Sequence, residues 1–107
     1  MQEPRPFLVH GQWKQGDIVS PVVDPFTGKL VAQVTQATES DIEQAVASTF
    51  SAAAPMRQLP SHARYDMLQR IATLLDRRRD EFTHTITTEA GKPITDAKRE
   101  VSRAIQT

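Results

Sequence analysis

The sequence predicts a mixed α and β chain in which a β-hairpin or meander is followed by three amphipathic helices. Two observations support this fold class. The first third holds short β-branched apolar runs separated by Gly and Pro turns, which is typical of strands. The rest of its 107 residues carries apolar side chains at helical spacing, with recognisable start and stop signals between the helices.

The strand region begins with "FLVHGQWK", two short runs joined by a turn at Gly11. The β-branched pair Val22 and Val23 follows and leads into "DPFTG". Pro25 restricts φ and Gly28 allows a positive φ, so this segment is expected to be a turn. "LVAQV" then resumes the strand pattern, and a hairpin or meander is the expected result.

The first helix is expected to begin at Ser40, which suits an N-cap, with Glu43 at the spacing of a capping box. Pro55 and Pro60 bracket "PMRQLP", which we interpret as a linker after the helix. The apolar stripe of this helix consists of Ile42, Ala45, Val46, Phe50 and Ala53.

The second helix is expected to start near Ser61 and to continue across Arg78 as one long helix, with or without a kink. Gly91 falls where a glycine commonly terminates a helix. Its apolar stripe consists of Met67, Leu68, Ile71, Leu74, Leu75, Phe82 and Ile86.

The third helix is expected to follow Pro93, because proline is favoured in a first helical turn. Its stripe consists of Ile94, Ala97, Val101, Ala104 and Ile105. No Gly or other cap follows Ile105, so the pattern is still helical at Thr107. We therefore expect residues 1–107 to be a segment that is truncated at its C-terminal end.

Composition excludes several classes of protein. Lys plus Arg and Asp plus Glu each number 13, so no positive field recruits nucleic acid, and Arg77–Arg79 is interpreted as a solvated face. The absence of Cys excludes disulfides and thiolate catalysis in this segment. No signal peptide or membrane span is recognisable, so a cytoplasmic protein is expected. The hydrophobic fraction of 38% is small for an independent core, which suggests that the apolar stripes pack against something else.

Candidate site residues are few. His10, His62 and His84 have no metal-ligand spacing, and the four glycines form no phosphate-binding loop. Glu89 is notable because a carboxylate near a helix C-terminus is unfavourable unless a cation, a partner base or solvent compensates it. Solvent exposure and a bound cation both remain open at this point.

The order of motifs resembles the N-terminal segment of the aldehyde dehydrogenase superfamily. The resemblance runs from Phe7 to Thr107 through "VVDPFTGKLVAQV", "ESDIEQAVASTFSAA" and "RYDMLQRIATLLDRRRDEFTHTITTEAGKPITDAKREVSRAIQT". Asp24 stands where Asn is commoner in that family. The ending "EAGKPITDAKREVSRAIQT" is most similar to the lactaldehyde, phosphonoacetaldehyde and non-phosphorylating glyceraldehyde-3-phosphate branch.

The resemblance implies an α/β fold in which this segment is the opening part of the cofactor-binding domain. Such enzymes oxidise an aldehyde to an acid with NAD or NADP, using a cysteine thiolate and a general-base glutamate that lie beyond this segment. It therefore implies no catalytic and no cofactor-binding residue here. Many members bind a monovalent cation, and the matching positions are the carbonyls of Val22 and Val23 and the carboxylate of Glu89.

The expected function is thus that of an N-terminal fragment of an NAD(P)-dependent aldehyde dehydrogenase. Its partners are expected to be the remainder of its own chain, an aldehyde substrate of the parent, and further copies in a dimer or tetramer. No nucleic acid and no membrane is expected. The alternative is a self-standing helical module that binds a partner protein through the same stripes, and a nucleic-acid binder through Arg77–Arg79 is a distant third.

Overall fold

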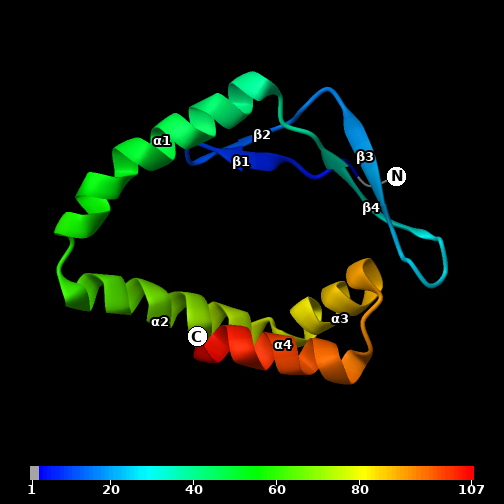
Figure 1. The fold of residues 1–107 in the computed structure, drawn as a ribbon. Helices are drawn as coiled ribbons and strands as arrows, with labels where there is room; N and C mark the ends of the chain where they lie inside the picture. The colour runs from blue at the N-terminus through cyan, green and yellow to red at the C-terminus, as the bar shows by residue number, and fades with distance from the viewer. Residues whose placement is uncertain (1–2) are drawn as a thin grey trace. The chain divides into compact units, whose positions relative to one another are not determined.

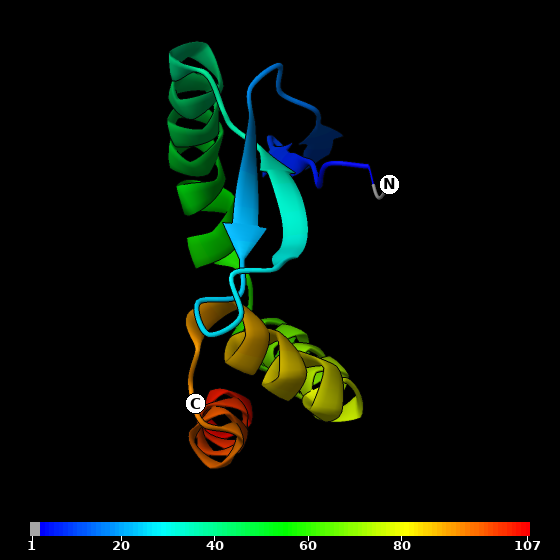
Figure 2. The same cartoon turned by 90° about the vertical axis from the view of Figure 1, so that its right-hand side faces the viewer.

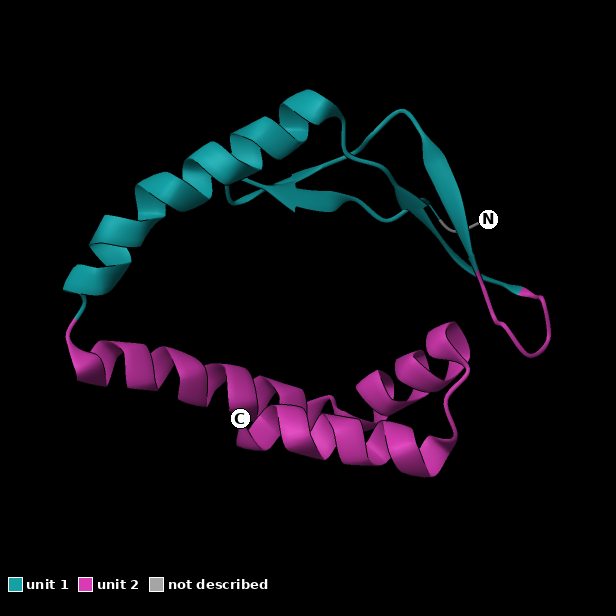
Figure 3. Ribbon diagram, viewed as in Figure 1, with its two compact units in different colours: residues 1–22, 30–59 teal, residues 23–29, 60–107 magenta. Residues whose placement is uncertain are grey.

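The computed structural model describes residues 3–107, in which four strands precede four helices (Figure 1). The chain forms two compact units (Figure 3). Among the described residues, the first contains 3–22 and Leu30–Leu59, and the second contains Val23–Lys29 and Pro60–Thr107. The expected order of strands followed by helices is confirmed.

The first strands form an antiparallel hairpin, β1 (Phe7–Val9) and β2 (Gln12–Lys14), in which Leu8 lies opposite Trp13. His10 and Gly11 connect them with φ angles of 50° and 72°. Two successive left-handed residues are the conformation of a two-residue hairpin turn that matches the strand twist. The turn predicted at Gly11 is confirmed.

The next strands, β3 (Val19–Val23) and β4 (Leu30–Thr35), form a second two-stranded sheet (Figure 2). Arg5 extends it through its backbone, since its N–H donates to the Gln33 carbonyl at 2.8 Å and its carbonyl accepts from the Thr35 N–H at 3.0 Å. The prediction of a hairpin around "DPFTG" is therefore confirmed.

Helix α1 spans Glu39–Gln58, and the prediction that Ser40 is its N-cap was wrong. Thr38 is the N-cap, because its hydroxyl oxygen accepts the Asp41 N–H at 3.2 Å while Asp41 Oδ2 accepts the Thr38 N–H at 2.9 Å. Lys14 of β2 donates a further hydrogen bond to Asp41 Oδ1. This reciprocal box, reinforced by Lys14, selects Thr38 over Ser40.

The expected linker after the first helix was also wrong, because α1 continues through Pro55 to Gln58. Proline lacks the N–H that would bond the carbonyl four residues earlier, which normally disturbs a helix. Here the proline lies in the last turn. The helix therefore loses one bond close to its end, and Leu59 alone separates α1 from Pro60.

The single long second helix is two helices, α2 (Ser61–Arg77) and α3 (Arg79–Ala90). The break lies at Arg78, where φ is −106° and ψ is 20°. Arg79 stabilises the break, because its guanidinium donates to Asp76 Oδ1 on α2 at 2.8 Å and to Ser102 Oγ at 2.7 Å. The chain thus has four helices rather than three in its described part.

Helix α4 spans Ile94–Gln106 and carries Ser102. It packs against both α2 and α3 (Figure 1). Gly91 ends α3 with φ at 68°, its N–H donating to the Thr87 carbonyl at 3.0 Å, and Pro93 precedes α4 as its N-cap. The predicted joint between two helices is confirmed, although the α4 stripe is buried only at Ala97 and Val101.

The buried apolar core is small within residues 3–107. It comprises Val9 and Ala32 in the first unit and Ala97 and Val101 in the second. Larger apolar side chains are exposed: Phe26 by 94%, Phe50 by 84% and Trp13 by 72%. Within the same residues, no helix combines the length and apolar character needed to cross a bilayer.

Acid should weaken the first unit through Asp41. Hydrogen bonds from Lys14 and then from Thr38 lower the pKa of this carboxyl from 3.8 to about 2. Because the pKa is lower in the folded state, the ionised carboxylate stabilises the fold fully above pH 3.8. This stabilisation is lost as the pH falls towards about 2. Measuring the free energy of unfolding across this range should show a smaller pH dependence for Asp41→Asn than for the wild type. Identical pH profiles would contradict the interaction.

Replacing Gly91 with alanine should destabilise the second unit more than replacing Gly28. Both glycines have φ close to 70°, but a Cβ on Gly91 would lie 2.7 Å from Pro25 Cγ, whereas nothing lies within 4 Å of one on Gly28. We expect Gly28→Ala to cost about 1 kcal/mol and Gly91→Ala about 1–3 kcal/mol more by chemical denaturation. Equal losses would show that Pro25 does not contact this joint.

Candidate functional site

The turn after β3 is organised by the carboxylate of Asp24. Its Oδ1 accepts the backbone N–H groups of Phe26 at 2.8 Å and Thr27 at 3.2 Å, and Gly28 completes the turn with a positive φ. These hydrogen bonds, that of Phe26 first, lower the pKa of Asp24. The amide oxygen of asparagine could accept the same bonds, so aspartate preserves the local turn geometry.

The C-terminal end of α3 is the other part of the predicted site. Glu89 lies exposed in the last turn of this helix, two residues before Gly91. The final carbonyls of a helix carry partial negative charge, so a carboxylate there is favourable only with a nearby cation or full hydration. Solvent exposure and a bound cation, the two alternatives from the sequence, are therefore both compatible with the position of Glu89.

Pro25 brings the Asp24 turn and the end of α3 together within the second unit. The tight approach of Pro25 to Gly91, described above, leaves no room for a side chain at Gly91. Val23 and Glu89 thus belong to two segments that meet, while Val22 lies at the end of β3 in the first unit. The contact between Pro25 and Gly91 is non-local, and sequence reasoning missed it.

The predicted cation site combines backbone carbonyls with one carboxylate. No group of three or more His, Cys, Asp or Glu side chains could hold a metal in the part of the chain that the structure describes. A site made from the carbonyls of Val22 and Val23 and the Glu89 carboxylate is of a different kind and stays a prediction. Sequence reasoning also missed Thr87, whose buried hydroxyl has no hydrogen-bond partner among residues 3–107.

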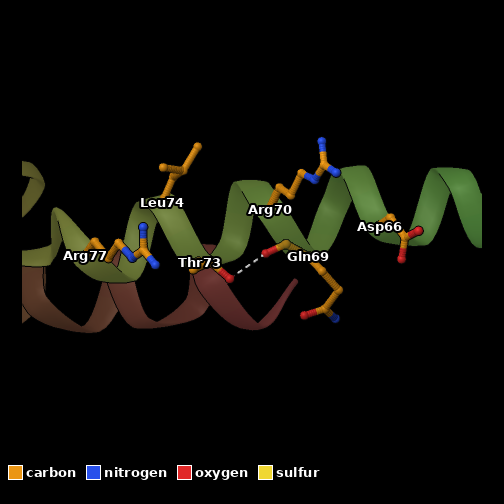
Figure 4. A pocket seen from close by; sticks show the side chains of 6 residues that line it. All are labelled: Asp66, Gln69, Arg70, Thr73, Leu74 and Arg77. Carbon is orange, nitrogen blue, oxygen red and sulfur yellow. Dashed lines mark hydrogen bonds between the residues drawn. The ribbon is translucent and has the colours of Figure 1, made fainter.

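A second surface feature lies on α2, remote in sequence from this turn. A shallow hollow there is lined by polar and charged side chains with one leucine among them (Figure 4). The lining residues are Asp66, Gln69, Arg70, Thr73, Leu74 and Arg77. The Thr73 hydroxyl donates to the Gln69 carbonyl of the same helix at 2.8 Å.

The histidines are dispersed over three elements. His10 lies in the turn between β1 and β2, His62 in the first turn of α2, and His84 in α3. The chain contains no cysteine. The chain therefore offers no thiolate nucleophile, and the oxygen ligands named above stay a prediction.

Comparison with known proteins identifies the family. The sequence model of the aldehyde dehydrogenase family matches residues 13–107. A malonate-semialdehyde dehydrogenase of Bacillus cytotoxicus is 35% identical over 100 residues, which cover 92% of this chain and 21% of the relative. A probable aldehyde dehydrogenase of a Pseudomonas species is 36% identical over 107 residues, or 98% of this chain and 22% of the relative.

Solved structures agree with the sequence relatives. The crystal structure of aldehyde dehydrogenase 21 from Physcomitrella patens, in complex with the reaction product succinate, superposes with a TM-score of 0.92 at 31% identity. That match covers 99% of this chain and 22% of the Physcomitrella enzyme. The chain thus spans about a fifth of the length of the relatives that it matches. Since the family model covers most of its residues, the chain belongs to the aldehyde dehydrogenase family.

Proposed function

We propose that this chain is the N-terminal part of a longer NAD(P)-dependent aldehyde dehydrogenase that oxidises an aldehyde to a carboxylic acid. The family match over residues 13–107 carries this proposal. The chain covers only 21–22% of the length of these relatives, which agrees with the proposal. The chain contains no cysteine, and the proposal assigns the thiolate nucleophile to another part of the enzyme.

The exposed apolar side chains support the same proposal. On α1, Ile42, Val46 and Phe50 are exposed by 56%, 65% and 84%, although they form one helical stripe. Contiguous apolar surface of this kind normally marks an interface. We infer that the remainder of the chain covers this stripe, and this family assignment disfavours a self-standing interaction module.

The role of this segment is therefore structural. A bound NAD or NADP would supply the hydride acceptor of such an enzyme, and a thiolate outside this segment would supply its nucleophile. No residue of this chain is proposed to touch the reacting atoms or the cofactor. The hairpins and α1–α4 instead complete the cofactor-binding domain, and the parent enzyme is proposed to be a cytoplasmic homo-oligomer.

A monovalent cation is proposed at the end of β3. The carbonyl oxygens of Val22 and Val23 and the carboxylate of Glu89 are its proposed ligands. Pro25 packs against Gly91, so the turn that follows Val23 lies at the helix end that carries Glu89. A cation there would compensate a carboxylate at a helix C-terminus.

The full-length protein should form NAD(P)H only when an aldehyde is present, and the 107-residue chain should be inactive. Absorbance of the reduced cofactor measures this directly. Malonate semialdehyde, lactaldehyde and glyceraldehyde-3-phosphate make a suitable first panel, each with NAD and with NADP. Failure of the full-length enzyme with a broad aldehyde panel and both cofactors would contradict the proposed activity.

Removing the charge of Glu89 should abolish stabilisation by the cation. A ligand that binds only the folded state raises its melting temperature. We expect the full-length wild type to melt at a higher temperature with KCl or NaCl than with choline chloride at the same ionic strength. Glu89→Gln should lose this difference, while Glu43→Gln, an exposed glutamate on α1, should keep it. Retention of the cation effect in Glu89→Gln would exclude Glu89 as a ligand.

A further inference from the structure

Asp24 accepts hydrogen bonds from successive backbone N–H groups of the turn that follows β3. Its side-chain Oδ1 accepts those of Phe26 at 2.8 Å and Thr27 at 3.2 Å, and its backbone carbonyl accepts that of Gly28 at 2.7 Å. An aspartate that bonds the backbone of its own turn in this way offers the chain a fixed local path. The conformation of the turn from Pro25 to Gly28 therefore depends on the Asp24 side chain.

The backbone of Asp24 also sets the direction of the Val23 carbonyl. The Asp24 N–H donates to the Lys29 carbonyl at 2.9 Å. The peptide bond between Val23 and Asp24 is trans, so its C=O and N–H point in opposite directions. The Val23 oxygen thus points away from Lys29 and does not pair β3 with β4.

Pro25 connects this turn to the end of α3. Its Cγ, Cβ and Cδ lie 2.7, 3.6 and 3.9 Å from the point that a Cβ on Gly91 would occupy. The ring therefore packs on Gly91, two residues after Glu89, and the turn and α3 belong to the same unit (Figure 3). Because the ring fixes the φ of Pro25, it moves only together with the backbone of the turn.

We propose that Asp24 is a positioning residue for the monovalent cation proposed above. Its side chain fixes the turn, the turn holds Pro25 on Gly91, and the Val23 carbonyl is thereby kept at the helix end that carries Glu89. Groups that orient metal ligands without touching the metal typically lower its affinity about 10–100-fold when they are removed. The inference rests on the proposed cation and assigns Asp24 a geometric role.

Geometry and charge predict different results for two substitutions. Asp24→Asn removes the negative charge but keeps an oxygen that can accept the N–H groups of Phe26 and Thr27. Asp24→Ala removes both the charge and the acceptor. If Asp24 places the ligands, asparagine preserves cation binding and alanine does not. If the carboxylate attracts the cation directly, both variants weaken binding equally.

Thermal unfolding of the full-length enzyme measures the cation affinity of each variant. KCl or NaCl replaces choline chloride at constant ionic strength, and the rise in melting temperature gives the apparent dissociation constant. We expect Asp24→Ala to raise this constant about tenfold and Asp24→Asn to leave it within about twofold. Thr38→Ala, which removes the N-cap hydroxyl of α1, is the control for general destabilisation. It should lower the melting temperature without changing the constant.

A second pair of substitutions tests the path through Pro25 without a bound cation. In choline chloride, Gly91→Ala should lower the melting temperature less in the Asp24→Ala background than in the wild type, because a loosened turn lets Pro25 move away from the added Cβ. In the Thr38→Ala background the two losses should add, because Thr38 lies in the first unit.

Three results would overturn the role of Asp24. They are an unchanged dissociation constant in Asp24→Ala, an equal loss of affinity in Asp24→Asn and Asp24→Ala, and additive losses for Asp24→Ala and Gly91→Ala. A wild-type enzyme that does not respond to KCl or NaCl would contradict the proposed cation and the role of Asp24 together. A response that Asp24→Ala retains would contradict the role of Asp24 alone and leave the cation standing.

Discussion

The buried carboxylate of Asp41 determines how the first unit is assembled. The residue is only 1% exposed, and burying a carboxylate is costly unless hydrogen bonds and an opposite charge compensate it. Thr38 satisfies one oxygen at the start of α1, and Lys14 of β2 satisfies the other. The start of the longest helix is therefore tied to a hairpin far away in the sequence. With so few buried apolar residues nearby, this polar connection fixes the position of α1 on β1 and β2.

Local signals predicted the elements well but could not decide between similar alternatives. The strands, the Gly11 turn and the joint at Gly91 and Pro93 were predictable, because Gly alone readily adopts a positive φ and Pro fixes its own φ. The N-cap was not, since Thr38 with Asp41 and Ser40 with Glu43 both fit a capping pattern, and Lys14 selects the first. The break at Arg78 depends similarly on the bonds of Arg79 to both neighbouring helices.

At the candidate cation site, too, the local turn follows from the sequence, whereas the contact between distant segments does not. Aspartate at position 24 suggested a departure in the turn, yet the carboxylate makes the hydrogen bonds that the turn requires. The approach of Pro25 to Gly91 joins residues that are far apart in the chain, which periodicity and spacing cannot reveal. The family resemblance, and not the pattern of residues, suggested Val22, Val23 and Glu89. Every residue has a backbone carbonyl, so a carbonyl ligand cannot be recognised from the amino-acid type.

The exposure of Phe50, Trp13 and the α1 stripe has a consequence for biosynthesis. In the longer enzyme proposed above, this segment would leave the ribosome before the part that covers it, and translation adds only about 5–20 residues per second. Its apolar surfaces would remain uncovered for on the order of tens of seconds before the rest of the domain is made. During that interval the nascent chain presents a surface suited to chaperones that hold unfolded segments. Protection during translation is thus a requirement of a fold whose first segment has almost no core of its own.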